Sequence, residues 1–582
     1  MKKLSTLAVL FLCVLATQAQ YFEHLYGRPM DEVLGDGKNT TNTVGHILVG
    51  QGTGFSLPMA QISVTHTDIT GFPIFNHEYE IYNTAGDAVY TNTPKVFEFP
   101  NGSGDFGIVG MLSDPPFTTS PPTTGVFYFT VDASGSPLNV YEYRINTTVS
   151  TFEVIDVAAV ALSASGNEAY ITGTAQVSFT EAYTFIIKID INSGGLIWSW
   201  VYDVSNSANQ NRDMAADIIE SPYSSDVVVV GHTYETGLSE DAYLFTVDAG
   251  SGSVTGTVQL YGGGSSWDYF SSIEIANQVG GFIIGGYTAP SSISPYDSWM
   301  MLVDPAGVPF WDYTYDYSQI PGTDDRCYDV IERLNTSGQY EYYGAGTAYV
   351  GVFGTSDALV IKVDANGNGV GEYTYGDANF QNCYKIDQMN GTAADGLSLF
   401  GAGDFSLAPI SPSDLFLIKT YFNGETPCHF SSSTPNPIPS PAYANPNPTA
   451  VQLTDFFDNV LTMNYGKISD KQQCYSRSLI SGSNASIAPN EPKGDKQAII
   501  SPNPMQQGAT QAIVELSAET ATTVSVNIYD MLGRNYYTGE HTLVKGSNHL
   551  PIDISNTNMA AGMYTIQISG TDISKNILLM VK

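Results

Sequence analysis

The sequence has few cationic residues, and this shortage restricts its partners. Lysine and arginine number 22 against 58 acidic residues, which gives a net charge of −36. So acidic a chain repels nucleic-acid phosphates and anionic lipid head groups. The charge is compatible with cation binding and equally with plain solubility. After the first twenty residues, no apolar run approaches the ~18 residues that a membrane span requires, so we expect neither nucleic-acid binding nor a transmembrane span.

Motifs for familiar catalytic chemistry are also missing. The sequence contains no G-x-S-x-G, no H-E-x-x-H and no P-loop. Its eight histidines are scattered, and no carboxylate pair stands out among 58 acids. The sequence therefore predicts no catalytic residue and no cofactor, and it favours a non-enzymatic protein over an enzyme.

The N-terminus has the features of an export signal. Lys2 and Lys3 precede an apolar stretch, and Thr17-Gln18-Ala19 supplies the small residues of a cleavage site. We therefore predict a signal peptide over residues 1–19 and export through the periplasm.

A repeat of four short strands fills residues 20–428. Its register is set by an Asp-containing turn that recurs every 56 to 64 residues, at Asp68, Asp132, Asp190, Asp248, Asp304 and Asp364, with Thr420 in the seventh copy. One four-stranded sheet exposes two apolar faces, and packing such sheets around an axis buries them. The pattern predicts an all-β, seven-bladed β-propeller. The copies in residues 30–143 match weakly and form either two degenerate blades or another structure.

Cysteine is the next scarce residue, with four copies beyond the signal peptide: Cys327, Cys383, Cys428 and Cys474. An even number in an exported chain suggests disulfides, and four cysteines allow three pairings. Cys327 and Cys383 occupy matching places in consecutive repeats, so a bond between them across neighbouring inner strands is conceivable. Cys428 and Cys474 would then pair with each other.

One turn resembles the start of a calcium loop. Asp364, Asn366 and Asn368 place oxygens at alternate positions, followed by Gly369. Tyr375 stands where a bidentate carboxylate is needed, and the stretch coincides with the common turn of the repeat. A structural turn is favoured, and calcium is the alternative.

The composition changes after Cys428. Six prolines occur between residues 435 and 448, and residues 481–497 are polar without periodicity. This composition is typical of extended linkers, so residues 429–497 are predicted to be a Pro-rich and polar linker.

The last residues, 498–582, form a separate domain. They contain a Ser-Pro-Asn-Pro start, a Leu-Gly-Arg turn and an Ala-Gly-Met-Tyr strand start, with motif positions Pro502, Asn503, Pro504, Gly533, Arg534, Gly562 and Tyr564. This order resembles the type A C-terminal sorting domain of Bacteroidetes type IX secretion cargo, and the repeat resembles secreted bacterial propellers that often precede such a domain. The resemblance implies a small immunoglobulin-like β-sandwich that engages the type IX secretion machinery.

Together these features predict a secreted or cell-surface protein. The favoured function is a non-enzymatic binding or adhesion module whose propeller loops recognise a glycan or a surface protein. The alternative is a secreted polysaccharide hydrolase or lyase that uses acidic residues at the propeller channel.

Overall fold

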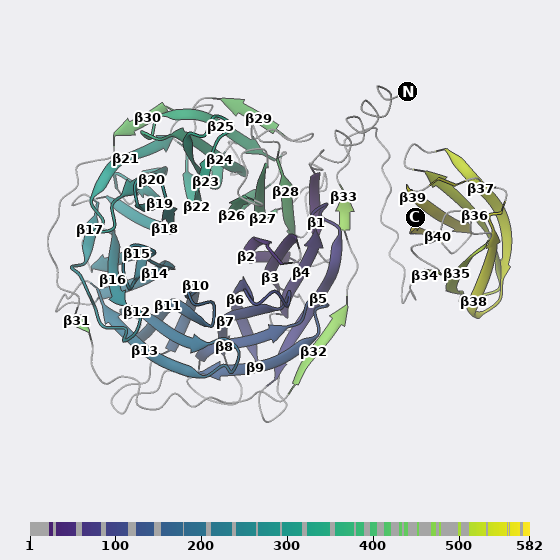
Figure 1. The fold of residues 1–582 in the computed structure, drawn as a ribbon, viewed down its shortest axis with the longest axis horizontal. Coiled ribbons are helices and arrows are strands. Elements are labelled where there is room, and N and C mark those ends of the chain that lie inside the picture. The colour runs from purple at the N-terminus through teal and green to yellow at the C-terminus, as the bar shows by residue number, and fades with distance from the viewer. Residues whose placement is uncertain are drawn as a thin grey trace, which may run out of the picture. The chain divides into compact units, whose positions relative to one another are not determined.

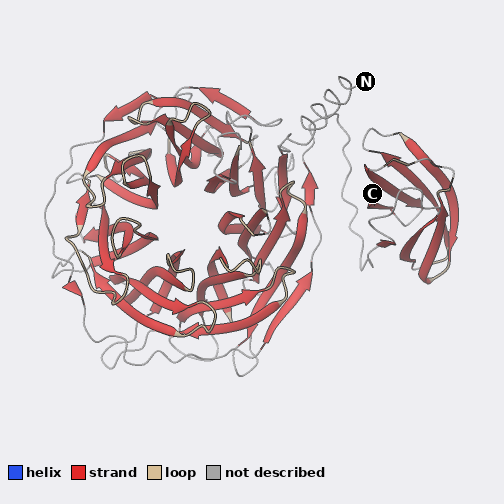
Figure 2. Cartoon of the chain, in the orientation of Figure 1, coloured by secondary structure: helices blue, strands red, loops and turns tan. Residues whose placement is uncertain are grey.

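The computed structural model describes three stretches of the chain, residues 22–420, 430–478 and 499–581. Within them the undescribed gaps are 27–30, 43, 54–60, 83–88, 114–123, 145–152, 179, 205–210, 236–239, 263–265, 292–293, 317–322, 350–355, 377–379, 389–395, 404–412, 434–435, 440–450, 453–466, 473–475, 502–510, 519, 531–533, 556, 558, 561 and 571–573. All regular elements in these residues are β-strands (Figure 2). The described part has no helix of the length and apolarity needed to cross a membrane. The chain divides into two compact units, Met1–Gly482 and Ser483–Lys582.

The first unit is built from antiparallel groups of four strands, here called quartets. The first three quartets are β2 (Asp31–Thr40), β3 (Gly45–Thr53), β4 (Gln61–Asp68) and β5 (Pro73–Tyr82); β6 (Tyr90–Glu98), β7 (Phe106–Ser113), β8 (Thr124–Val131) and β9 (Pro137–Tyr143); and β10 (Glu153–Leu162), β11 (Glu168–Ser178), β12 (Glu181–Asp190) and β13 (Leu196–Asp203).

The next three quartets repeat this order. They are β14 (Asn211–Glu220), β15 (Asp226–Glu235), β16 (Glu240–Asp248) and β17 (Gln259–Tyr261); β18 (Trp267–Ala276), β19 (Gly281–Ala289), β20 (Asp297–Val303) and β21 (Pro309–Asp316); and β22 (Asp325–Leu334), β23 (Tyr340–Tyr349), β24 (Ser356–Asp364) and β25 (Gly369–Tyr375).

The seventh quartet combines the two ends of the repeat region. β26 (Gln381–Gln388), β27 (Leu397–Gly403) and β28 (Asp414–Lys419) are joined by β1 (Phe22–Tyr26), which pairs with β28 from Phe22↔Lys419 to Tyr26↔Leu415. In Figure 1 the quartets lie around a central hole, with their first strands innermost, in a propeller-like ring. Residues 30–143 thus form two regular quartets. The apolar cores lie between neighbouring quartets, as in the cluster that joins Val109 and Tyr128 to Val154 and Ile171.

Tyrosine hydroxyls link neighbouring quartets at six of the junctions between described residues. Tyr202 of the third quartet donates a hydrogen bond to the Gly252 carbonyl in the turn of the fourth at 2.7 Å. Equivalent bonds run from Tyr79, Tyr143, Tyr261 and Tyr315 to Gly135, Gly194, Gly307 and Gly367. Tyr26 of β1 makes the same bond to Gly71 of the first quartet at 2.5 Å. In the other linked quartets the tyrosine belongs to the fourth strand. The N-terminal strand β1 therefore acts as the fourth strand of the seventh quartet and links it to the first.

The aspartate turn that marks the repeat joins the third and fourth strands of a quartet. The Asp304 carboxylate accepts hydrogen bonds from the N–H groups of Ala306 and Val308, both at 2.9 Å, and Gly307 has a φ of 83°. The side chain closes the turn, while glycine adopts the left-handed conformation at no steric cost.

Part of the segment predicted to be a linker instead adds strands to the outer edges of the ring. We call these strands the strap: β29 (Phe430–Ser433), β30 (Asn436–Pro439), β31 (Val451–Gln452), β32 (Lys467–Gln472) and β33 (Ser476–Ser478). They pair with β25, β21, β13, β5 and β1, respectively (Figure 1). Two prolines in β30 are tolerated because an edge strand does not need every N–H in a ladder.

The Cys327–Cys383 disulfide, which the matching repeat positions made conceivable, is not formed. Both cysteines are free and buried. Cys327 belongs to the core shared with Met300 of the fifth quartet, whereas Cys383 belongs to the core shared with Val360 of the sixth. Matching repeat positions face the preceding quartet, so the sixth quartet separates the two thiols. Cys428, Cys474 and the predicted signal peptide lie outside the described residues.

The second unit consists of two sheets around one core. One contains β34 (Ile499–Ser501), β35 (Gln511–Ala518) and β38 (Gly546–Asp553); the other contains β37 (Asn535–Leu543), β36 (Thr522–Asp530), β39 (Gly562–Gly570) and β40 (Ser574–Val581). Val514 and Ile552 of the first sheet share a buried cluster with Val526 and Ile566 of the second. Inter-sheet packing is thus the source of its stability.

The buried histidine His66 of β4, whose ring contacts Phe106 of the second quartet at 4.9 Å, makes stability pH-dependent. Burial, opposed by Asp68, lowers the pKa of His66 to about 4. The unfolded histidine binds a proton near pH 6.5, so this stability is complete above that pH and declines as the pH falls towards 4. We expect the His66 contribution to fall by about 2 kcal/mol between pH 7 and pH 5.

Urea unfolding of wild type and His66→Gln at both pH values measures this term. The variant should lose less stability than wild type over the same interval. Equal losses in the two proteins would contradict the assignment to His66. The comparison between proteins removes the opposite contribution of buried carboxyls such as Glu274, whose pKa is raised by burial.

Candidate functional site

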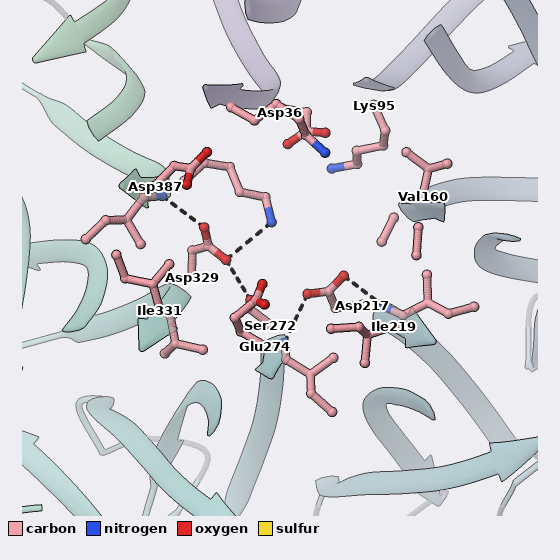
Figure 3. A pocket seen from close by; sticks show the side chains of 18 of the residues that line it. Asp36, Lys95, Val160, Asp217, Ile219, Ser272, Glu274, Asp329, Ile331 and Asp387 are labelled. Carbon is pink, nitrogen blue, oxygen red and sulfur yellow. Dashed lines mark hydrogen bonds and ion pairs between the residues drawn. The ribbon is translucent and has the colours of Figure 1, made fainter. Parts of the chain in front are cut away.

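A cavity of about 270 Å³ occupies the middle of the ring (Figure 3). First strands from all seven quartets line it with residues 36–38, 95, 158–161, 217–219, 272–274, 329–331 and 385–387. Its walls combine charged side chains with aliphatic ones such as Ile219 and Ile331. Concave sites of this mixed character are where small ligands usually bind.

A β-bulge in each first strand sets which side chains face the cavity. In β22 the ladder shifts between Cys327 and Asp329, and in β26 between Cys383 and Lys385. The extra residue re-aims the following side chain. The residues after the bulges are Asp36, Lys95, Ala159, Asp217, Ser272, Asp329 and Lys385.

Three of these positions carry carboxylates that bind the next quartet. Asp329 accepts a hydrogen bond from the Ile386 N–H at 2.9 Å and from the Ser272 hydroxyl at 2.6 Å. Asp36 and Asp217 make the same contact with the N–H groups of Val96 and Ile273, each at 3.0 Å. These acids therefore stabilise the junctions between quartets.

The lysines at the cavity have opposite pKa shifts. Burial alone would lower the pKa of Lys385, but the carboxylates of Asp329, Asp217 and Asp36 outweigh it and raise the pKa. The Lys385 Nζ lies 3.4 Å from the Asp329 carboxylate. For Lys95, burial outweighs its acidic neighbours and lowers the pKa. Lys385 is therefore the cation that balances the buried acids.

Two further carboxyls in the cavity have raised pKa values. Burial raises the pKa of Glu274 to about 7 and that of Asp387 to about 6. Asp387 accepts hydrogen bonds from the N–H groups of Asn39, at 2.8 Å, and Gln388. Glu274 accepts one from the Ile275 N–H at 3.1 Å. Glu274 is thus the cavity acid best suited to proton exchange near neutral pH.

Replacing Asp329 by asparagine is expected to destabilise the ring by about 1–3 kcal/mol, because an amide cannot serve three donors as a carboxylate does. Chemical denaturation measures the loss. Asp304→Asn is the matched control, since Asn335 already closes an equivalent turn through its amide oxygen at 2.9 Å. Equal stabilities of the two variants would contradict the structural role of Asp329.

The candidate calcium turn is closed by its own side chains. The Asp364 carboxylate accepts hydrogen bonds from the N–H groups of Asn366 and Asn368 and from the Asn368 amide. Within the described residues no group of three or more His, Cys, Asp or Glu side chains is placed to hold a metal.

The sorting-motif positions are only partly described. Pro502, Asn503, Pro504 and Gly533 lie outside the described residues. Gly562 begins β39, and Arg534 directly precedes β37. The Tyr564 hydroxyl donates a hydrogen bond to the Ala560 carbonyl at 2.9 Å.

Residues 500–582 match the family described as the secretion system C-terminal sorting domain. This tail marks the chain as type IX secretion cargo, exported to the cell surface or secreted. No curated protein matches the sequence.

Several solved structures resemble the chain distantly. An N-acetylgalactosamine deacetylase from F. plautii, solved with blood group B trisaccharide, is 9% identical, with 53% of this chain and 91% of that chain covered and a TM-score of 0.28. Drosophila Semaphorin 2a is 9% identical, with 97% and 99% covered and a TM-score of 0.28. A quinohemoprotein alcohol dehydrogenase from Pseudomonas putida HK5 is 11% identical, with 71% and 78% covered and a TM-score of 0.32. Likenesses this weak carry no argument about activity.

Proposed function

We propose that the chain is a seven-bladed β-propeller, each quartet being one blade, that works outside the cell as a non-enzymatic binding or adhesion module. β1 completes the seventh blade, which supports a closed ring, and the Tyr26–Gly71 hydrogen bond repeats the linkage between the other blades. The residue 498–582 domain is an immunoglobulin-like sandwich that the type IX machinery recognises. A rigid ring with variable loops suits recognition by the loops at one end.

The observation that carries this proposal is the use of the cavity acids. Asp36, Asp217 and Asp329 each bind a backbone N–H of the next blade. Catalytic carboxylates must instead approach substrate as an acid and a base or nucleophile. Because these three acids hold the blades together, they are poorly placed to act on a substrate, and this favours binding without turnover.

The test is incubation of the purified full chain with a panel of soluble and insoluble polysaccharides and with intact cells. We expect retention on a ligand without release of reducing ends or of unsaturated products. Release of either product would overturn the non-enzymatic proposal.

Glu274 supports the alternative of a polysaccharide hydrolase or lyase. Burial raises its pKa to about 7, and the charges of Asp329 and Asp217 add to the rise. A protonated carboxyl near ionised ones is the arrangement that a general acid requires. If the chain releases products, Glu274→Gln should abolish the release while leaving ligand retention intact.

A further inference from the structure

The tyrosines of the ring fall into two classes. Those between blades, such as Tyr202 and Tyr315, are fully buried and donate their hydroxyls to glycine carbonyls. Five others, here called the tyrosine arc, are half-buried: Tyr269, Tyr287, Tyr296, Tyr328 and Tyr384. Among the described residues, the hydroxyls of Tyr269, Tyr287 and Tyr296 have no hydrogen-bond partner. Interblade linkage therefore accounts for the first class and not for the second.

The arc is a continuous set of aromatic contacts across three adjacent blades. Tyr269 and Tyr287 stack with centroids 4.7 Å apart, and Tyr296 lies edge-on to Tyr287 at 5.2 Å. Tyr287 reaches Tyr328 of the sixth blade at 6.2 Å, and Tyr328 reaches Tyr384 of the seventh at 5.4 Å. β18, β22 and β26, which carry three of these rings, lie on the inner side of the ring in Figure 1.

The repeat itself shows that the fold does not need tyrosine at two of these places. Tyr328 and Tyr384 are the extra residues of the bulges in β22 and β26. The same position is occupied by Gly35, Ala158 and Ala216 in other blades, and by Ser271 in the fifth. Large rings are thus confined to one side of the channel. Tyr384 also packs against the core that contains Leu34 and Phe400, but the fold forms the same bulge with small residues elsewhere, and such asymmetry in a repeat is expected of a ligand site.

Arg326 lies in the arc as its only cation within the described contacts. Its guanidinium lies 4.7 Å from the Tyr296 centroid and 5.1 Å from that of Tyr287. Its ion pair with Asp324 is long, at 3.7 Å, and its buried Nε has no partner among the described residues. The Arg326 side chain is also hydrogen-bonded to Tyr328. Arg326 is therefore held by two ring faces and one tyrosine hydroxyl, and a guanidinium with five N–H donors keeps some of them for a ligand.

We propose that the tyrosine arc, with Arg326, binds neutral oligosaccharides. Aromatic faces pack against the C–H surfaces of pyranose rings, while tyrosine hydroxyls and the guanidinium hydrogen-bond to sugar hydroxyls. Asp324 and Glu240 lie nearby and the whole chain carries −36, so polyanionic sugars are disfavoured. This inference names a ligand class for the proposed binding function and rests on that function.

Isothermal titration of the full chain with cellohexaose, xylohexaose, mannohexaose and maltohexaose, and with an acidic oligogalacturonide, tests the site. The variant is Tyr328→Ser with Tyr384→Ser, which installs the residue found at position 271. Phe310→Ala, at a ring that is 57% exposed on β21, is the control. We expect at least one neutral sugar to bind, a loss of ten-fold or more in affinity in the double variant, and no loss in the control.

The outcomes separate the site from the function. If the double variant still binds a neutral sugar as tightly as wild type does, the tyrosine arc is not the binding site, although the proposed binding function stands. Binding to the oligogalacturonide alone, or to no probe while the chain is still retained on cells, overturns the ligand class. Hydrolysis or elimination of a probe overturns the non-enzymatic function itself. A melting temperature of the double variant within a few degrees of wild type ensures that a loss of affinity reflects the site.

Discussion

Deletion of residues 22–26 should lower the free energy of unfolding of the propeller by about 5 kcal/mol or more. The deletion removes the ladder between β1 and β28 and the burial of Leu25 and Tyr26, which are 5% and 1% exposed. Burying two such side chains contributes about 3–6 kcal/mol, before the hydrogen bonds are counted. It also exposes the edge of β28, where other chains can pair. Thermal and urea unfolding measure the loss, and size-exclusion chromatography reports the association.

Two matched substitutions distinguish the effect of ring closure on stability from a general loss of stability. Tyr26→Phe removes only the hydroxyl that binds the Gly71 carbonyl and should cost about 1 kcal/mol. Tyr202→Phe removes the equivalent hydroxyl between the third and fourth blades and should cost about the same amount. An unchanged melting temperature after deletion of residues 22–26 would show that β1 does not close the ring.

Gly346→Ala should have the second large effect, a loss of about 3 kcal/mol or more, or failure to fold. A Cβ at this position would lie 1.7 Å from the Arg326 carbonyl oxygen. The bulge in β22 places that carbonyl against the second strand, so only glycine fits. The same contact occurs at Gly173, Gly231 and Gly286, with distances of 1.9–2.1 Å to backbone oxygens.

Gly195→Ala is the control for this prediction. Its added Cβ would meet only the Ser193 hydroxyl at 3.2 Å, and that side chain can move. We expect its stability to remain within about 0.5 kcal/mol of wild type, as for most surface substitutions. Equal unfolding curves for the two alanine variants would contradict the close approach at Gly346.

The repeat could be predicted from sequence because its turn chemistry is local. Asp304 and Gly307 determine one turn by themselves, so their recurrence revealed the register of the ring. β1 escaped notice since five residues far from the repeat carry little periodicity. The strap was not predicted because its strands pair through backbone groups, which leave no side-chain pattern, and because its Pro-rich composition is typical of a linker.

The candidate sites were harder to predict because their residues are far apart in sequence. Asp329 contacts Ile386 in the next blade, and no local pattern marks such a pair. Tyr328 and Tyr384 directly follow the two cysteines in the sequence. Their significance depends on the bulge, which shows that they occupy the position that Ser271 holds in the fifth blade. The cysteine pairing failed for the same reason, since spacing alone does not show which core a side chain faces.

Electron microscopy of the purified full chain, viewed down the axis of its larger unit, tests the central claim most directly. Seven lobes that surround a central hole without a gap are the predicted result. An arc with a missing segment, or a ring with another number of lobes, would contradict it.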